Sequence, residues 1–240
     1  MDKLIELNAD VGEGGPDSLL MPLVDRVSIA CGGHAGDMAS MREALMRARE
    51  LGILPGAHPG YPDPVNFGRK PINAAPKDIS RWVAGQTRSL LDVAASLGVM
   101  LFHVKPHGAL YNQAVVDKAT AEAVIEAMLE LKGLALITLA GSPLAGWART
   151  AGLVVLEEAF ADRRYLQDGQ LAPRNLPDAV IDEPGQAASQ ALAIASGHPV
   201  EPMGGGSLFI RAQTICLHGD GPGAKKRAEA VASALRDNRI

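Results

Sequence analysis

Histidines gather where the strand-like segments of this sequence end. Of the six histidines in the 240 residues, five lie at or just beyond the C-terminal end of a predicted strand. These five are His34, His58, His103, His107 and His218. Imidazole groups exchange protons near neutral pH, and with a carboxylate they can hold a divalent metal that leaves a position for water. The chemistry that these residue types favour is hydrolytic.

Carboxylates and cations accompany the histidines. Asp10 and Glu13 follow the first predicted strand, and the pair Glu157–Glu158 follows the sixth. Lys105 and Arg163 could hold a carboxylate, the arginine through two parallel hydrogen bonds. A lone histidine at a strand end is more often structural, and the Glu pair is equally well explained as solvated loop charge. Five histidines and an aspartate at one rim favour a functional cluster, because burying that many ionisable groups without a role is costly.

Short apolar runs alternate with helical patterns along the chain, which predicts the elements that position these residues. The expected strands are residues 4–10, 26–31, 53–58, 99–105, 134–139, 153–156 and 214–218. The expected helices are residues 38–51, 76–97, 117–131, 142–151, 184–196 and 222–235. Asp37 is best explained as the cap of the first helix. The segment 157–184 has no clear period, and an irregular loop of that length is usually functional.

Seven strands separated by helices imply a parallel α/β sheet in one domain over residues 1–240. The pattern leaves open whether the sheet is doubly wound or closed into a barrel. Right-handed crossovers place the C-terminal ends of all strands on one side, which is where such folds bind their substrates. The polar rim described above is therefore the expected active site.

Composition excludes several classes of function. The formal net charge is −4, and no basic cluster is longer than residues 225–227, so a nucleic-acid partner is not expected. No signal peptide or membrane-spanning segment is recognisable, which favours a cytoplasmic chain without a membrane partner. Cys31 and Cys216 are expected to be buried, unpaired thiols. The segment 219–226 lacks the Gly-Lys-Ser/Thr ending of a phosphate-binding loop, and no serine-hydrolase elbow is present.

Conspicuous motifs span nearly the whole chain in a fixed order. They are LNADVGE (7–13), IACGGHAGD (29–37), GAHPGYPD (56–63), FGR (67–69), HVKPHGALYN (103–112), FADRRY (160–165), PR (173–174) and HGD (218–220). Together these motifs resemble the LamB/YcsF family, whose characterised members are the A subunits of bacterial 5-oxoprolinase.

The resemblance implies an irregular (β/α) barrel of seven strands, similar to glycoside hydrolase and deacetylase barrels. It implies ATP-dependent opening of 5-oxo-L-proline to L-glutamate, together with subunits B and C. No stretch of the chain is left for a recognisable nucleotide-binding domain, so we expect ATP to act through the partner subunits. A homo-oligomer is also compatible with the sequence.

These considerations select the candidate site residues. The catalytic candidates are Asp10, Glu13, His34, His58, Lys105, His107 and Asp162, and the substrate-binding candidates are Arg163, His218 and Asp220. Asp10 with His58 or His107 would activate water, and Lys105 with Arg163 would hold a carboxylate or a phosphorylated intermediate. Asp162 and Asp220 would orient their neighbours. Asp10, His58 and His107 are also candidate ligands of a divalent metal, because their order along the chain resembles the metal triad of deacetylase barrels.

Two further classes of function fit the same residues. The first is a stand-alone, metal-dependent deacetylase or carbohydrate hydrolase on the same barrel. The second is a binding subunit that performs no chemistry.

Overall fold

Seven parallel strands close into a barrel, in which each strand pairs with the next along the chain and the seventh pairs with the first. The computed structural model of the chain describes residues 5–15, 17–219 and 223–237. The strands are β1 (Glu6–Val11), β2 (Arg26–Ala30), β3 (Leu54–His58), β4 (His103–Val104), β5 (Ala135–Leu139), β6 (Val155–Phe160) and β7 (Thr214–Leu217). The predicted seven-stranded (β/α) barrel is confirmed, and the closed form is the one that the chain adopts.

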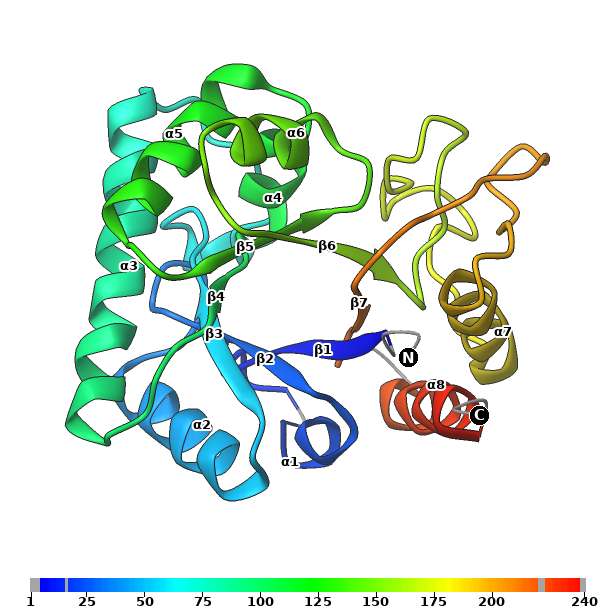
Figure 1. Cartoon of the computed structure of the whole chain (residues 1–240), viewed down its shortest axis with the longest axis horizontal. Coiled ribbons are helices and arrows are strands. Elements are labelled where there is room, and N and C mark those ends of the chain that lie inside the picture. The colour runs from blue at the N-terminus through cyan, green and yellow to red at the C-terminus, as the bar shows by residue number, and fades with distance from the viewer. Residues whose placement is uncertain (1–4, 16, 220–222, 238–240) are drawn as a thin grey trace.

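Helices surround the barrel on its outer side (Figure 1). The longer ones are α2 (Met38–Leu51), α3 (Pro76–Ser96), α5 (Lys118–Glu130), α6 (Pro143–Thr150), α7 (Pro184–Ala195) and α8 (Ala224–Asp237). All six were expected, although Pro222 at the predicted start of α8 lies outside the described residues. Four short turns of helix were not expected: α1 (Asp17–Leu20), η1 (Met21–Leu23), η2 (Pro64–Asn66) and α4 (Gly108–Ala114). None is longer than the 7 residues of α4, which is too short to show a helical period.

The ends of α2 and α3 follow from local sequence. The Asp37 side chain accepts hydrogen bonds from the backbone N–H groups of Ala39 and Ser40, so its predicted capping role is confirmed. Gly52 closes α2 in the left-handed conformation with φ of 68°. Pro76 occupies the first turn of α3, where the missing N–H costs no helical hydrogen bond.

Strand β4 has two residues, whereas residues 99–105 were expected to form it. The neighbouring strand β3 explains the difference. Residues 55 and 57 of β3 face β4, because their carbonyls accept from the N–H groups of Phe102 and Lys105. Position 55 is a proline with no N–H to donate in return, so regular pairing begins only beyond Phe102.

Strand β6 extends further than its predicted end at residue 156. Glu157 and Glu158 lie within it, paired with Thr138 and Leu139 of β5, so the prediction that they follow the strand was wrong. The Glu158 side chain is fully buried, which also rules out a solvated loop charge at that position. Two consecutive glutamates hid the strand because carboxylates rarely occupy buried strand positions.

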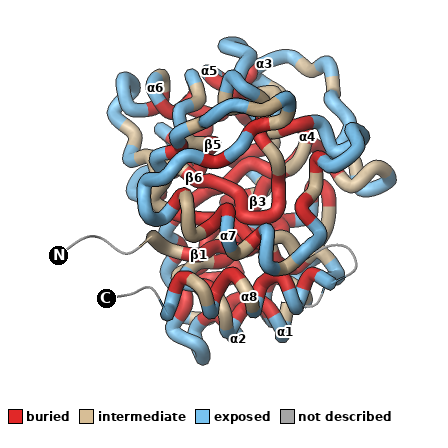
Figure 2. The backbone as a smooth tube through the Cα atoms, turned by 90° about the vertical axis from the view of Figure 1, so that its right-hand side faces the viewer, coloured by how far each residue is buried: buried red, intermediate tan, exposed pale blue. Residues whose placement is uncertain are grey.

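The strands form the most deeply buried layer of the molecule (Figure 2). Aliphatic side chains dominate the core that lies between the strands and the helices. Several polar residues are fully buried too, among them Ser28 of β2 and His103 of β4, whose side chains lie 3.2 Å apart. His103 is therefore an internal residue of the barrel, and its predicted place at the rim was wrong. Burial lowers the pKa of His103 to about 3, so the ring is neutral.

The structure also answers two predictions about the cysteines and about membrane-spanning segments. Cys31 and Cys216 are both free and buried, as predicted. No helix in the described part of the chain is long and apolar enough to cross a bilayer.

The tight fit around His103 gives a test of the fold. A Cβ atom on Gly56 would lie 2.4 Å from the His103 ring, so we expect Gly56→Ala to destabilise the protein by about 1–3 kcal/mol through overpacking. Gly85 in α3 is a matched control, because a Cβ there meets nothing within 4 Å. Gly85→Ala should stabilise the helix by roughly 0.5–1 kcal/mol. Urea denaturation of both variants measures the difference, and equal effects would contradict the described packing.

Candidate functional site

Loops at the C-terminal ends of the strands surround a cavity of about 530 Å³. Seven of the predicted site residues line it: Asp10, Glu13, His58, Lys105, His107, Arg163 and His218. His34 and Asp162 lie behind the lining residues: His34 contacts Glu13, and Asp162 contacts His218. Asp220 lies outside the described residues. Residues from five different strand ends therefore meet at one place, as the topology predicted.

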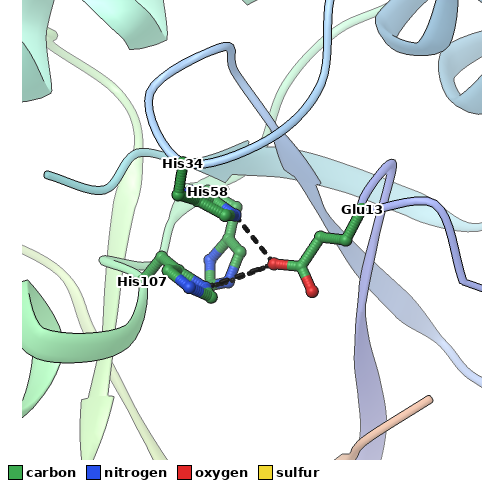
Figure 3. Close-up of side chains that lie close together, drawn as sticks. All are labelled: Glu13, His34, His58 and His107. Carbon is green, nitrogen blue, oxygen red and sulfur yellow. Dashed lines mark hydrogen bonds and ion pairs between the residues drawn. The ribbon is translucent and has the colours of Figure 1, made fainter. Parts of the chain in front are cut away.

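Three imidazoles and one carboxylate converge at the base of the cavity (Figure 3). Glu13 Oε1 lies 2.8 Å from His34 Nε2, 3.2 Å from His107 Nδ1 and 3.6 Å from His58 Nε2. The rings of His34 and His107 are stacked, with centroids 3.5 Å apart and planes 3° from parallel. The His58 ring stands nearly perpendicular to both.

Glycines provide the space for this stack of rings. A Cβ on Gly60 would lie 2.8 Å from His34 Nδ1, and one on Gly68 would lie 2.8 Å from His34 Cβ and 3.1 Å from His107 Cδ2. The Gln86 side chain fixes Gly60 by accepting from its N–H and donating to its carbonyl. The glycines of the GAHPGYPD and FGR motifs are therefore needed for close approach, as well as for turning the chain.

Backbone carbonyls determine where the histidine protons are. His58 Nδ1 lies 2.7 Å from the carbonyl oxygen of Lys105, and His107 Nε2 lies 2.9 Å from that of Phe67. A carbonyl can only accept, so these two nitrogens carry the hydrogens. The remaining nitrogens, His58 Nε2 and His107 Nδ1, face each other at 3.0 Å. In neutral rings both of them carry lone pairs.

The pKa shifts within the cluster differ in direction from one histidine to another. Burial lowers the pKa of His34 to about 4 and also lowers the pKa of His107, so both are neutral at pH 7. Burial acts in the same direction on His58, but the adjacent Asp10 carboxylate outweighs it and raises the pKa of His58. Burial opposes ionisation of Asp10 and Glu13, yet their imidazole partners and, for Asp10, Lys105 hold both pKa values well below the usual range.

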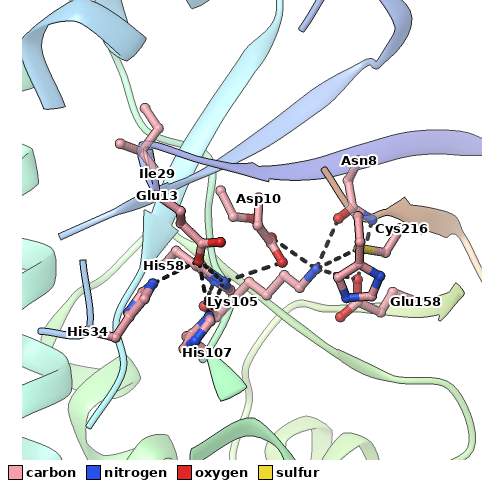
Figure 4. A network of polar contacts seen from close by, with 12 residues as sticks. Asn8, Asp10, Glu13, Ile29, His34, His58, Lys105, His107, Glu158 and Cys216 are labelled. Atoms are coloured by element: carbon pink, nitrogen blue, oxygen red, sulfur yellow. Dashed lines mark hydrogen bonds and ion pairs between the residues drawn. The ribbon is translucent and has the colours of Figure 1, made fainter. Parts of the chain in front are cut away.

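The buried Lys105 ammonium joins several strands (Figure 4). Its Nζ lies 2.9 Å from a Glu158 oxygen and 3.1 Å from an Asp10 oxygen, and it donates to Asn8 Oδ1 at 3.2 Å. Burial disfavours the charged form, but Asp10 and Glu158 outweigh it and raise the pKa of Lys105 well above its usual value. With Cys216 Sγ at 3.2 Å, four acceptors within the protein surround the three N–H groups. Lys105 therefore positions carboxylates, and its contacts do not support the expected role of holding a substrate carboxylate.

Asp162 and His218 form a second buried pair beside the cavity. His218 Nδ1 donates to Asp162 Oδ1 at 2.8 Å, and the His218 ring stacks on Phe160. Burial disfavours the charged form of Asp162, but the neighbouring His218 outweighs burial, so the pKa of Asp162 is lowered. Asp162 thus orients His218, in agreement with the role expected for it. Arg163 is buried next to the pair and donates to the carbonyl of Ala172.

Three charged residues of the site were not selected from the sequence. Glu158 was not selected because its strand was predicted to end at residue 156, which left a solvated loop charge as an equally good explanation. Arg69 and Arg174 also line the cavity, and Arg69 lies 5.0 Å from the centroid of the Phe67 ring, which itself packs edge-on against His34 and His107. The FGR and PR motifs contained both arginines, so the signal was present, but no strand end marked either position.

Two groups of side chains among the described residues are placed to hold a metal ion. The first comprises Glu13, His34, His58 and His107, and the second comprises Asp10, Cys216 and His218. Within each group the candidate ligand atoms lie within 4.8 Å of one another. Asp10 belongs to the second group by this measure, although its Oδ2 also lies 3.3 Å from His58 Nε2.

Comparison with known proteins places the chain in a family. The sequence profile of the LamB/YcsF family matches residues 5–240. The chain belongs to the LamB/YcsF family. A relative from Chloroflexus aggregans, named as the A subunit of 5-oxoprolinase, is 46% identical, covering 96% of this chain and 94% of its own. Another protein of the same name, from Syntrophobacter fumaroxidans, is 42% identical, covering 98% and 96% respectively.

Solved structures agree with the family and the fold. A lactam utilization protein from Thermus thermophilus matches this LamB/YcsF chain with a TM-score of 0.92 and 41% identity, covering 97% of this chain and 96% of the other. A family 4 carbohydrate esterase from Streptomyces lividans matches with a TM-score of 0.52 and 11% identity, covering 98% of this chain and 89% of the other. The second likeness shows the barrel fold alone. Both the predicted family and the predicted likeness to deacetylase barrels are confirmed.

The role of Lys105 can be tested by removing its charge. Lys105→Met leaves the carboxylates of Asp10 and Glu158 buried without their cation, and we expect a loss of about 3–5 kcal/mol of unfolding free energy. The double variant Lys105→Met/Glu158→Gln removes one of those charges and should lose less than the single variant. Urea denaturation at pH 7 measures both. A single variant as stable as the native chain would show that the ammonium does not organise the barrel.

Proposed function

We propose that this chain is the A subunit of an ATP-dependent 5-oxoprolinase, which opens 5-oxo-L-proline to L-glutamate in the cytoplasm together with subunits B and C. The observation that carries the proposal is identity of 42–46% over nearly the full length of relatives that bear the name of this A subunit. The solved relative named a lactam utilization protein points to the same substrate class, since 5-oxoproline is a lactam.

The cavity suits a small anionic lactam. Its lining combines imidazoles and carboxylates with the guanidinium groups of Arg69, Arg163 and Arg174. Guanidinium groups bind carboxylates through paired hydrogen bonds, so these arginines would hold the substrate carboxylate. The ring amide would then face His58 and His107.

Opening the lactam requires a base, an acid and stabilisation of an oxyanion. Water adds to the amide carbonyl carbon, the C–N bond breaks, and the nitrogen takes up a proton to become the amine of glutamate. In this proposal His107 Nδ1 takes the proton from water. His58, which contacts both His107 and Asp10, returns one to the leaving nitrogen. Glu13 would keep both rings in position.

The energy-coupling step belongs to the partner subunits in this proposal. The 240 residues contain no Walker A sequence, and the glycine-rich segment 219–226 ends in two lysines followed by Arg227, where that motif has Lys followed by Ser or Thr. The A subunit would act on a carbonyl that the ATP-dependent step has activated. Its own task is then positioning and proton transfer.

A second candidate function rests on the cluster of three histidines and Glu13. Such a donor set could serve a stand-alone, metal-dependent hydrolase of amides or esters on the same barrel. Activity of the isolated chain without ATP, lost on chelation, would favour this candidate over the 5-oxoprolinase.

The decisive measurement is ATP-driven glutamate formation from 5-oxoproline by subunits B and C, with and without this chain. We expect turnover to depend on the chain, and Asp10→Asn and His107→Ala to lower kcat by about 10²–10⁴-fold as proton transfer fails. Arg174→Gln should act mainly on KM, because its charge binds the substrate carboxylate.

His198→Ala serves as the matched control, because His198 is exposed and far along the chain from every site residue. It should leave kcat and KM unchanged. Turnover by B and C that needs no A subunit would refute the proposed function, and unchanged turnover in both the Asp10 and His107 variants would refute the assignment of the site.

A further inference from the structure

The lone pairs of the histidine cluster point at one another. His58 Nδ1 and His107 Nε2 are committed to backbone carbonyls, so the atoms left at the centre are His58 Nε2, His107 Nδ1 and Glu13 Oε1. None of these three has a hydrogen when the rings are neutral. Three electron-rich atoms that close repel one another unless a cation lies between them.

A single proton resolves this conflict only in part. A hydrogen on His58 Nε2 can point at one acceptor at a time, whereas His107 Nδ1, Asp10 Oδ2 and Glu13 Oε1 all lie within 3.0–3.6 Å of it. Among the described residues, Asp10 also has the Lys105 ammonium, but the ion-pair partners of Glu13 are all imidazoles. The position between Glu13 and the three rings is therefore where positive charge is most needed.

The distances between the candidate ligand atoms are close to, and mostly shorter than, those in a small coordination sphere. Zinc ligands lie about 2.0–2.2 Å from the ion, so neighbouring tetrahedral ligands are roughly 3.3–3.6 Å apart. The observed separations are 3.0 Å for His58–His107, 3.2 Å for His107–Glu13, 3.6 Å for His58–Glu13 and 2.8 Å for His34–Glu13. All four atoms lie within 4.8 Å of one another, and side-chain movements would bring them to one ion.

The surroundings have the features of a metal site's outer shell. Metal-binding histidines usually donate their second N–H to a carbonyl or carboxylate, which fixes the ring and raises its basicity. His58 and His107 do so through Lys105 and Phe67. The buried Nδ1 of His34 has no hydrogen-bond partner among the described residues, and its Nε2 points at Glu13.

We propose that Glu13, His34, His58 and His107 form a binding site for one divalent transition-metal ion, with Zn²⁺ as the best match. Three imidazoles and one carboxylate suit zinc, whereas Mg²⁺ and Ca²⁺ prefer all-oxygen sites. This ligand set replaces the triad of Asp10, His58 and His107 expected from the sequence, because Lys105 holds Asp10. The proposal concerns metal binding and does not depend on whether the chain takes part in opening 5-oxoproline. With the ion bound, His58 Nε2 and His107 Nδ1 would be ligands, so the proton-transfer roles given to them above apply to the metal-free chain.

The test measures metal binding to the full chain after dialysis against a chelator. Zn²⁺ is titrated by calorimetry, and Co²⁺ is titrated by its visible absorption, which reports the coordination number. We expect one ion per chain, the intense bands of four-coordinate cobalt, and a higher Tm with zinc. Glu13→Gln, which keeps the shape of the side chain, should weaken zinc binding at least tenfold, and His107→Ala should abolish it.

Two matched variants decide between the ligand sets. Asp10→Asn should weaken zinc binding less than Glu13→Gln does, since Asp10 lies outside the proposed set and only contacts its member His58. The exposed His198→Ala should bind zinc like the native chain. Circular dichroism confirms that each variant is folded. The rise in Tm of the native chain with zinc tests metal binding without any substitution. Loss of binding in Asp10→Asn with retention in Glu13→Gln would overturn the proposed set in favour of the triad.

Absence of stoichiometric zinc and cobalt binding by the native chain would overturn the site altogether and leave a protonated His58 as the balancing charge. Because the readout is bound metal, that result would not touch the proposed 5-oxoprolinase role. Conversely, a chain that binds zinc but is not needed for glutamate formation would retain the site and refute the activity.

Discussion

The barrel and the site are connected through one residue, Lys105. Its ammonium bridges Glu158 of β6 and Asp10 of β1, its carbonyl accepts the His58 Nδ1 hydrogen, and its N–H donates to Ala57 of β3. A buried ammonium is tolerated only where carboxylates surround it, and buried carboxylates need a cation in return. Lys105 and Asp10 therefore each favour the charged form of the other, and the orientation of His58 depends on the same segment.

This arrangement explains why so polar an interior is compatible with a stable barrel. Asn8 donates to Glu158 and Thr214 while it accepts from Lys105, so its amide links three strands across the interior. A network in which each member is paired is rigid, whereas one missing partner would leave a charge buried alone. This network holds the Asp10 carboxylate beside His58 Nε2, the ring nitrogen that is not bonded to the Lys105 carbonyl.

The sequence was sufficient to predict the elements and the rim, but it could not predict which polar residues contact one another. Strand ends marked by Asp10, His58 and Lys105 were recognisable because parallel strands bring their C-terminal ends together. Glu158 was missed because its partner lies 53 positions away in the chain, and local pattern carries no information about such pairs. The short β4 was overestimated for a related reason, since the proline that limits it belongs to the neighbouring strand β3.

The residues that line the cavity differ in how they are held in place, and this difference decides which of them tolerate change. Asp10, His58 and Lys105 belong to strands or follow them directly, and each is fixed by contacts with other strands. Arg69 and Arg174 lie instead on irregular segments between β3 and α3 and between β6 and α7. Loops tolerate substitution and insertion more readily than a buried ionic network. Asp10, His58 and Lys105 are therefore constrained by the stability of the barrel, whereas the positions of Arg69 and Arg174 can change without disturbing that network.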